Sequence, residues 1–271
     1  MADEPILLER HDDGVVVLTF NDPERRNAMT RAMGEALASR VAELGGDREL
    51  RAVVLTGAGR AFCAGGDLDF IQAMADAGRA DPAGPTRRQN REAMRSFYGL
   101  FLSVRQIPCP TVAALNGAAV GAGLCVALAC DVRIAARDAR LGLNFARLGI
   151  HPGMGATWTL PRIVGPAHAA DLLLTGRLVE GAEAERMGLV NRATDRDRVL
   201  PEALEMAQQI AGAAPAAVRG TRAALERALG ASLEDQLSFE ADRQAECYET
   251  ADLQEGLRAA REKRAAEFRG K

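Results

Sequence analysis

The chain has 271 residues, of which 48% are hydrophobic, so it is long enough to bury a large core. Its formal net charge of −3 gives no global attraction to nucleic acid or to an acidic membrane, and an anionic ligand must therefore be met by local groups. Five cysteines without a CxxC pair or a Cys/His cluster argue against zinc and disulfide frameworks and favour free thiols. The N-terminus lacks a signal pattern, and no apolar run approaches the roughly 20 residues of a membrane span. We therefore expect a cytoplasmic protein with no metal and with neither membrane nor nucleic acid as a partner.

The first part of the chain predicts the order strand, strand, helix, strand. Strand patterns over 6–10 and 15–20 flank a turn at Gly14 and predict an opening hairpin. Apolar residues at helical spacing follow over 30–44, and the apolar run 52–56 predicts a short buried strand.

The segment 73–89 differs in composition from what precedes it. Ala, Gly, Pro, Asp and Arg dominate it, with Asp81-Pro82-Ala83-Gly84-Pro85 at its centre, and it is predicted to be a mobile loop that covers a site. The elements predicted after it are a helix over 91–106, a strand over 111–115, a helix over 124–129 and strands over 132–135 and 141–145.

The character of the chain changes near residue 200. Before it we expect short helices near 154–160 and 167–174, a helix over 182–187 and a strand over 189–192. Beyond it, helical periodicity continues over 201–213, 215–229, 233–248 and 252–268. We therefore divide the chain into a core, 1–199, and a helical C-terminal part, 200–271, which serves either as a cap on the core or as a surface for self-association.

Two Gly-rich turns, 57–67 and 116–123, each follow a strand pattern and lead into a helix pattern. Small residues let backbone N–H groups approach a substrate oxygen, and a helix N-terminus adds partial positive charge. Two such turns side by side could polarise one carbonyl group.

Further motifs occur in a fixed order around these turns. They are Pro23-Glu24-Arg25-Arg26-Asn27-Ala28, Cys130-Asp131, Leu148-Gly149-Ile150-His151-Pro152-Gly153, Leu174-Thr175-Gly176, Gly188-Leu189-Val190-Asn191, and Glu255-Gly256 with Glu262-Lys263-Arg264. This order resembles that of the crotonase, or enoyl-CoA hydratase/isomerase, superfamily over nearly the whole chain. The resemblance implies an α/β spiral of repeated ββα units with a helical C-terminal part. It also implies an acyl-CoA thioester as substrate, no cofactor other than the coenzyme A of that substrate, and a homotrimer or a dimer of trimers.

The resemblance assigns the oxyanion hole to the backbone N–H groups of Gly66 and Ala122. Ala122 stands where the family usually has glycine, which narrows the space but keeps the donor. The flanking residues that the resemblance places on the substrate are Ala64, Gly65, Asp67, Leu68 and Gly121. We expect Asp67 and Asp131 to have capping or turn roles and not to transfer protons.

The two glutamates that activate water in the family's hydratases correspond to Cys125 and Phe145, which we place at the substrate. Neither supplies a carboxylate, so hydration by a carboxylate pair and simple double-bond isomerisation are both in doubt. Polar or aromatic residues expected near the pocket mouth are Asn144, Arg147, His151 and Trp158. His151 is the candidate for proton transfer, although a ring nitrogen that caps the Pro152 turn explains it as well.

For the nucleotide end of coenzyme A, the resemblance points to Arg25 and Arg26 and to Lys263 in the terminal helix, the last often from an adjacent subunit. Asp69 and Ala260 depart from the family pattern there. Two hypotheses follow from Cys125 and Phe145 at the glutamate positions. The first is an acyl-CoA enzyme of lyase or hydratase type with altered proton chemistry. The second is a non-catalytic acyl-CoA-binding protein.

Overall fold

A computed structural model describes residues 4–81 and 84–271. Residues 1–3 and 82–83 lie outside the described residues, and so does the centre of the predicted loop 73–89. The strands are β1 Ile6–Arg10, β2 Val15–Phe20, β3 Ala52–Gly57, β4 Ala61–Cys63, β5 Thr111–Leu115, β6 Ala118–Val120, β7 Val132–Ala136, β8 Arg140–Gly142, β9 Val179–Glu180 and β10 Arg192–Thr194. The helices are α1 Arg31–Gly45, α2 Leu68–Ala80, α3 Pro85–Leu102, α4 Ala122–Leu128, α5 Ala156–Thr175, α6 Gly181–Arg186, α7 Val199–Ala211, α8 Pro215–Ala228, α9 Leu233–Tyr248 and α10 Ala251–Glu262. Short 3₁₀ helices are η1 Ser103–Gln106, η2 Asn144–Leu148 and η3 Arg196–Arg198.

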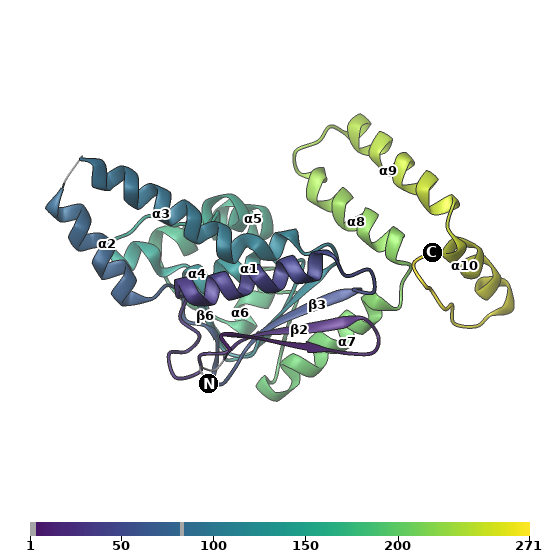
Figure 1. Ribbon diagram of the computed structural model, residues 1–271, viewed down its shortest axis with the longest axis horizontal. Coiled ribbons are helices and arrows are strands. Elements are labelled where there is room, and N and C mark those ends of the chain that lie inside the picture. Colours follow the sequence, from purple (N-terminus) through teal and green to yellow (C-terminus); the bar gives the residue numbers. More distant parts are fainter. Residues whose placement is uncertain (1–3, 82–83) are drawn as a thin grey trace.

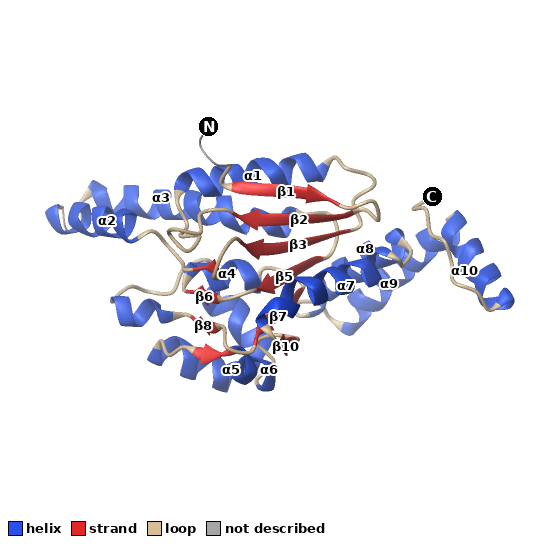
Figure 2. Ribbon diagram, turned by 90° about the horizontal axis from the view of Figure 1, so that it is seen from below, coloured by secondary structure: helices blue, strands red, loops and turns tan. Residues whose placement is uncertain are grey.

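The larger sheet has the strand order β1-β2-β3-β5-β7-β10 (Figure 2). The predicted hairpin of β1 and β2 is confirmed and is antiparallel, whereas the remaining neighbours pair in parallel. All six residues of β3 are buried. A continuous apolar strand of this kind is typical of a parallel sheet that is covered on both faces.

The smaller sheet has the order β4-β6-β8-β9, with β4, β6 and β8 parallel. The chain alternates between the two sheets, because β3, β5 and β7 enter the larger one and the strand that follows each enters the smaller one. These successive strand pairs with their helices form the predicted spiral of ββα units.

Helices cover the larger sheet, and the last three helices extend from it. Helix α7 packs against β2, β3, β5 and β7, and α1 packs against α3. Helices α8 and α9 pair with each other and project from the body, followed by α10 (Figure 1). We call α8–α10 the C-terminal arm.

The prediction of a mobile loop over 73–89 was wrong for most of its described residues. Helix α2 continues to Ala80, and α3 already begins at Pro85. Asp67 caps α2 as predicted, because its side chain accepts a hydrogen bond from the backbone N–H of Phe70. Phe70 of α2 stacks on Phe97 of α3 with 5.4 Å between ring centroids. This aromatic packing between segments 27 residues apart outweighs the loop-like composition, which local pattern reading could not reveal.

Three other predicted boundaries were wrong for local reasons. The strand predicted over 141–145 ends at Gly142, and η2 follows it. Gly149 closes η2, because it takes a left-handed φ of 74° and its N–H donates to the carbonyl of Ala146. The strand over 189–192 is displaced to β10, because the N–H groups of Leu189 and Val190 bond to Ala184 at the end of α6. The helix over 252–268 ends at Glu262 because Lys263 takes a φ of 53°.

Asn27 ties the segment before α1 to the ends of two strands. It is fully buried, and its side-chain amide donates to the carbonyl oxygens of Ala58, Ala61 and Phe62 at 3.0, 2.8 and 3.2 Å. Its side-chain oxygen accepts from the backbone N–H of Asp22 at 2.8 Å. Asn27 also has a φ of 56°, which asparagine tolerates better than most residues.

We expect Asn27→Ala to lower the free energy of unfolding by about 3 kcal/mol, because it leaves buried backbone groups unpaired and forces alanine into a left-handed conformation. Chemical denaturation measures this loss. Asn90→Ala, which removes a single part-buried bond to Met74, is the control and should cost about 1 kcal/mol or less. Equal losses for the two variants would show that Asn27 has no special structural role.

Candidate active site

A cavity of about 450 Å³ opens where β4 and β6 end, between the first turns of α2 and the middle of α3. Its walls are mainly apolar, from Phe70, Ile71, Met94, Phe97 and Met154. The residues proposed from the sequence that line it are Arg25, Arg26, Ala64, Gly65, Gly66, Asp67, Leu68, Gly121, Ala122, Asn144, Phe145 and His151. Segments from four distant parts of the chain thus meet at one cavity.

The parallel pairing of β4 with β6 places the two Gly-rich turns side by side. A Cβ atom built on Gly65 would lie 2.6 Å from the carbonyl oxygen of Val120 and 3.7 Å from the backbone nitrogen of Ala122. Gly65 has a φ of 99° and Gly121 a φ of 54°, conformations that favour glycine. Glycine is therefore required at both turns, by space at the first and by backbone conformation at both.

The backbone N–H groups of Gly66 and Ala122 have no acceptor among the hydrogen bonds of the described residues. Around Gly66, the carbonyl of Gly65 accepts from Met29 at 2.8 Å and the N–H of Asp67 donates to Met29 at 3.3 Å, but the N–H of Gly66 is unused. Ala122 is the first residue of α4, so its N–H has no partner within the helix. Both residues line the cavity. Gly66 and Ala122 thus each bring an acceptor-free N–H to the wall of the cavity, one from each of the adjacent turns.

Asp67 lines the cavity, but both of its carboxylate oxygens are engaged. One accepts from the N–H of Phe70 at 2.9 Å, and the other pairs with the guanidinium of Arg25. The predicted capping role is confirmed, and the ion pair also occupies Arg25, which the sequence suggested for coenzyme A.

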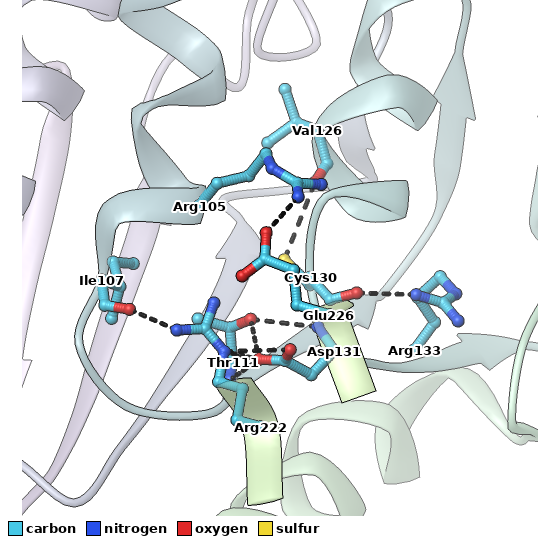
Figure 3. Close-up of polar contacts among 9 residues, drawn as sticks. All are labelled: Arg105, Ile107, Thr111, Val126, Cys130, Asp131, Arg133, Arg222 and Glu226. Atoms are coloured by element: carbon cyan, nitrogen blue, oxygen red, sulfur yellow. Dashed lines mark hydrogen bonds and ion pairs between the residues drawn. The ribbon is translucent and has the colours of Figure 1, made fainter. Parts of the chain in front are cut away.

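Asp131 lies outside this cavity and has a structural role. Its carboxylate accepts from the N–H and hydroxyl of Thr111, both at 2.8 Å, and it pairs with Arg222 of α8 at 2.9 Å (Figure 3). Arg222 also donates to the carbonyl of Ile107 at 2.6 Å. Asp131 thus joins β5 and β7 to the C-terminal arm, in agreement with the turn role expected for it.

Cys125 and Phe145, where the resemblance expects the family's glutamates, are both buried in the fold. Phe145 lines the cavity from η2 and is almost fully buried. Cys125 is buried in α4 behind the cavity, and its Sγ lies 3.8 Å from the carbonyl oxygen of Gly153. Burial raises the pKa of Cys125 to about 12, so the thiol keeps its proton and is neither a nucleophile nor a base at neutral pH.

Three polar side chains line the cavity near these positions: His151, Asn144 and Tyr98. Nδ1 of His151 lies 2.7 Å from the carbonyl of Pro152, which can only accept, so Nδ1 carries a proton. The side-chain oxygen of Asn144 lies 3.2 Å from the Cβ position of Gly121. Sequence patterns missed Tyr98, because its helix was predicted to start beyond a loop and nothing local linked it to the Gly-rich turns.

Arg147 and Trp158, expected at the pocket mouth, are elsewhere. Arg147 donates to the carbonyl of Thr175 at 2.8 Å. Trp158 faces a second cavity under the C-terminal arm, where the guanidinium of Arg162 stacks 4.1 Å from its ring centroid. The face of α5 that carries Trp158 therefore lines the second cavity and not the one at the Gly-rich turns.

Of the basic residues proposed for coenzyme A, some lie at the cavity and one lies far from it. Arg26 lies at the cavity and forms no ion pair among those of the described residues. Lys263 is exposed at the end of α10, which lies at the opposite end of the molecule from α2 (Figure 1). Within one chain Lys263 does not reach the cavity.

Over residues 4–81 and 84–271, no cluster of three or more His, Cys, Asp and Glu side chains suited to a metal ion occurs. In the same part of the chain, the helices include none with the length and apolar character needed to cross a membrane.

The model of the Enoyl-CoA hydratase/isomerase family matches residues 10–271. The chain belongs to this family. A Thermus thermophilus protein that is provisionally named an enoyl-CoA hydratase is 41% identical to this chain over 254 residues. The match covers 94% of this chain and 97% of that protein. The 1,2-epoxyphenylacetyl-CoA isomerase of Escherichia coli is 34% identical over 265 residues, 98% of each protein.

The fold of this enoyl-CoA hydratase/isomerase family member agrees with solved structures. The crystal structure of an enoyl-CoA hydratase from Bacillus anthracis has a TM-score of 0.87 at 34% identity, and the match covers 98% of this chain and 100% of that one. The predicted crotonase superfamily and its spiral fold with a helical C-terminal part are confirmed.

We expect the cysteines of the native protein to react very unequally with N-ethylmaleimide at pH 8. Cys63, Cys109, Cys125 and Cys130 are buried, and burial raises the pKa of each to about 12, so only about one in ten thousand of these thiols is ionised. Cys247, which is half-buried, should be labelled first, as peptide mass spectrometry would show. Cys247→Ser should then remove the fast phase. Rapid labelling of Cys125 would contradict its assignment as a protonated core thiol.

Proposed function

We propose that this chain is an acyl-CoA enzyme that holds the thioester oxygen between the N–H groups of Gly66 and Ala122 and stabilises the enolate of the acyl group. The two acceptor-free donors on adjacent turns of one cavity are the observation that carries this proposal. Donors of this kind contribute about 3 to 4 kcal/mol each to transition-state stabilisation in enzymes where one was removed. The names of the relatives from Thermus thermophilus and Escherichia coli both specify CoA thioesters, which supports the same substrate class.

The reaction we propose is of lyase or hydratase type, in fatty acid or related acyl-CoA metabolism, without a carboxylate pair. Cys125 keeps its proton and Phe145 has none to transfer, so another group must move protons. His151 lines the cavity, and the bond from Nδ1 to Pro152 leaves Nε2 free to accept a proton. We therefore assign the proton transfer to His151.

A second candidate function is acyl-CoA binding without turnover. The apolar character of both glutamate positions favours it, since a protein that only binds needs the thioester clamp and no base. Turnover of any CoA thioester separates the two candidates.

The coenzyme A end of the substrate is proposed to lie at Arg26. Arg25 contributes through its pair with Asp67, which fixes the first turn of α2 at the cavity. Lys263 would reach a nucleotide only from a second copy of the chain.

Self-association into a trimer or a pair of trimers is proposed to use the C-terminal arm. Support comes from exposed leucines on α8 and α9 and in the turn between them, Leu225, Leu229, Leu233 and Leu237. We propose the cytoplasm as the location, because the spacing of the cysteines in the sequence favours free thiols, which are typical of a reducing compartment.

Gly66→Leu should weaken substrate binding and turnover while the fold persists. A Cβ at Gly66 would meet only the flexible end of Ile71, at 3.3 Å, so the leucine side chain can enter the cavity and cover the free N–H. We expect the affinity for crotonyl-CoA, malonyl-CoA and 3-hydroxybutyryl-CoA, measured by calorimetry, to fall at least about tenfold, and any turnover detected by mass spectrometry to fall about 100-fold.

Gly45→Leu is the matched control, because a Cβ there meets nothing within 4 Å and the position lies at the end of α1. Unchanged binding and turnover in Gly66→Leu would show that the site is elsewhere. Tight binding of all three thioesters by the unmodified protein, with no product from any, would leave the binding protein as the function.

His151→Ala should lower kcat about 100-fold for a thioester that the unmodified protein converts, with little change in affinity, because only proton transfer is removed. Steady-state kinetics measures kcat, and thermal unfolding checks that the turn at Pro152 is intact. Full activity in a folded variant would show that His151 only caps that turn and does not transfer the proton.

A further inference from the structure

We propose that the second cavity, the one under the C-terminal arm, binds a small organic anion, namely a carboxylate that carries a short apolar chain. This cavity has a volume of about 280 Å³, and it shares no lining residue with the cavity at the Gly-rich turns. Its walls come from η1, α4, β7, α5 and α8. Binding there is therefore independent of the proposed function.

The charged groups that line this cavity do not balance. Four guanidinium groups and two carboxylates line it, those of Arg105, Arg133, Arg162 and Arg222 and those of Asp131 and Glu226. Arg105 pairs with Glu226, and Arg222 pairs with Asp131 at 2.9 Å (Figure 3). Arg133 and Arg162 have no carboxylate partner among the ion pairs of the described residues. Two positive charges at this cavity are thus left without an anion in the part of the chain that the structure describes.

Arg133 is the more deeply buried of these two arginines, with only 7% of its surface exposed near the start of β7. Its Nε donates to the carbonyl of Leu189 at 2.9 Å, and its Nη1 donates to the carbonyl of Cys130 at 2.7 Å. Its Nη2 has no partner among the hydrogen bonds of the described residues, although it is not fully enclosed by protein. Burial lowers the pKa of Arg133, but a guanidinium keeps its proton in proteins. Because a buried cation without an anion is costly, an anion that enters the cavity gains a charge-assisted hydrogen bond from Nη2.

Arg162 holds the second unpaired charge beside an indole ring. Its guanidinium carbon lies 4.1 Å from the ring centroid of Trp158, and its Nη1 donates to the backbone carbonyl of Trp158 at 2.7 Å. The guanidinium carbon of Arg105 lies 5.8 Å from the same centroid. The stacking and the bond to the carbonyl hold the guanidinium of Arg162 in place before a ligand arrives, so less conformational entropy is lost on binding.

The apolar walls decide which anion fits. Guanidinium groups bind both carboxylates and phosphates through paired hydrogen bonds. The apolar side chains at the cavity are Leu128, Ile163, Leu225 and Leu229. Leu225 and Leu229 are 68% and 65% exposed, so a hydrocarbon chain that lies against them removes apolar surface from water. Inorganic phosphate gains nothing from these walls, whereas a carboxylate with a short hydrocarbon chain contacts both the arginines and the leucines.

Trp158 is the only tryptophan of the chain, so intrinsic fluorescence reports directly on this cavity. The test titrates the whole chain with sodium hexanoate at constant ionic strength, and inorganic phosphate and 1-hexanol are the comparison ligands. We expect hexanoate to change the emission of Trp158 along a saturable curve. Phosphate and 1-hexanol should each bind at least about tenfold more weakly, because phosphate lacks the apolar chain and 1-hexanol lacks the charge.

Arg162→Gln should raise the dissociation constant for hexanoate about tenfold, because it removes a charge-assisted hydrogen bond. Arg91→Gln is the matched control and should leave this constant unchanged, since Arg91 is exposed on α3 and does not line the cavity. Gly66→Leu, which places a side chain in the first cavity, should also leave it unchanged. Thermal unfolding checks that each variant is folded.

The absence of a saturable response to hexanoate would overturn the proposal. Equal affinity for phosphate would show a site for any oxyanion, and equal affinity for 1-hexanol would show simple partition onto apolar surface, so either result contradicts the assigned ligand class. An unchanged dissociation constant in folded Arg162→Gln would show that this arginine does not bind the anion. A response that disappears in Gly66→Leu would place hexanoate in the first cavity and overturn the proposed site.

Discussion

The parallel pairing of two three-residue strands, β4 and β6, is the constraint on which the site depends. It brings the turn at Gly65 against the turn at Gly121, although more than 50 residues separate them in the chain. Helix α4 then lies directly on β4, because a Cβ at Gly123 would sit 2.4 Å from the carbonyl of Cys63. Glycine at these places lets two backbones approach closely enough to expose two N–H groups to one cavity.

The cavity combines backbone donors with apolar side chains at the two positions where the resemblance places glutamates. The backbone donors of Gly66 and Ala122 form part of the fold and do not depend on side chains. The glutamate positions have instead joined the core, with Cys125 protonated and Phe145 packed at the wall. Polar side chains line the same cavity from other elements, Tyr98 from α3 and His151 from the turn before α5. The fold thus places backbone donors and polar side chains at one cavity without a carboxylate at either of these two positions.

The C-terminal arm is joined to the core by charged groups. Arg222 of α8 spans from Asp131 to the carbonyl of Ile107, and Arg105 of η1 pairs with Glu226 (Figure 3). Asp131 is itself fixed by Thr111, so the contact is well ordered on the core side. The polar network places the arm while its leucines stay exposed.

The sequence by itself determined the family, the spiral fold, the hairpin and the cap at Asp67, because apolar periodicity, glycine spacing and capping are local properties. It also identified the residues that meet at the cavity through the two Gly-rich turns. Only the tertiary structure showed that residues 73–80 and 85–89 of the loop-like segment belong to α2 and α3, since the stacking of Phe70 on Phe97 acts between separate helices. For the same reason it alone placed Tyr98 in the site and Trp158 outside it: which helix face meets a cavity is decided by packing between distant segments.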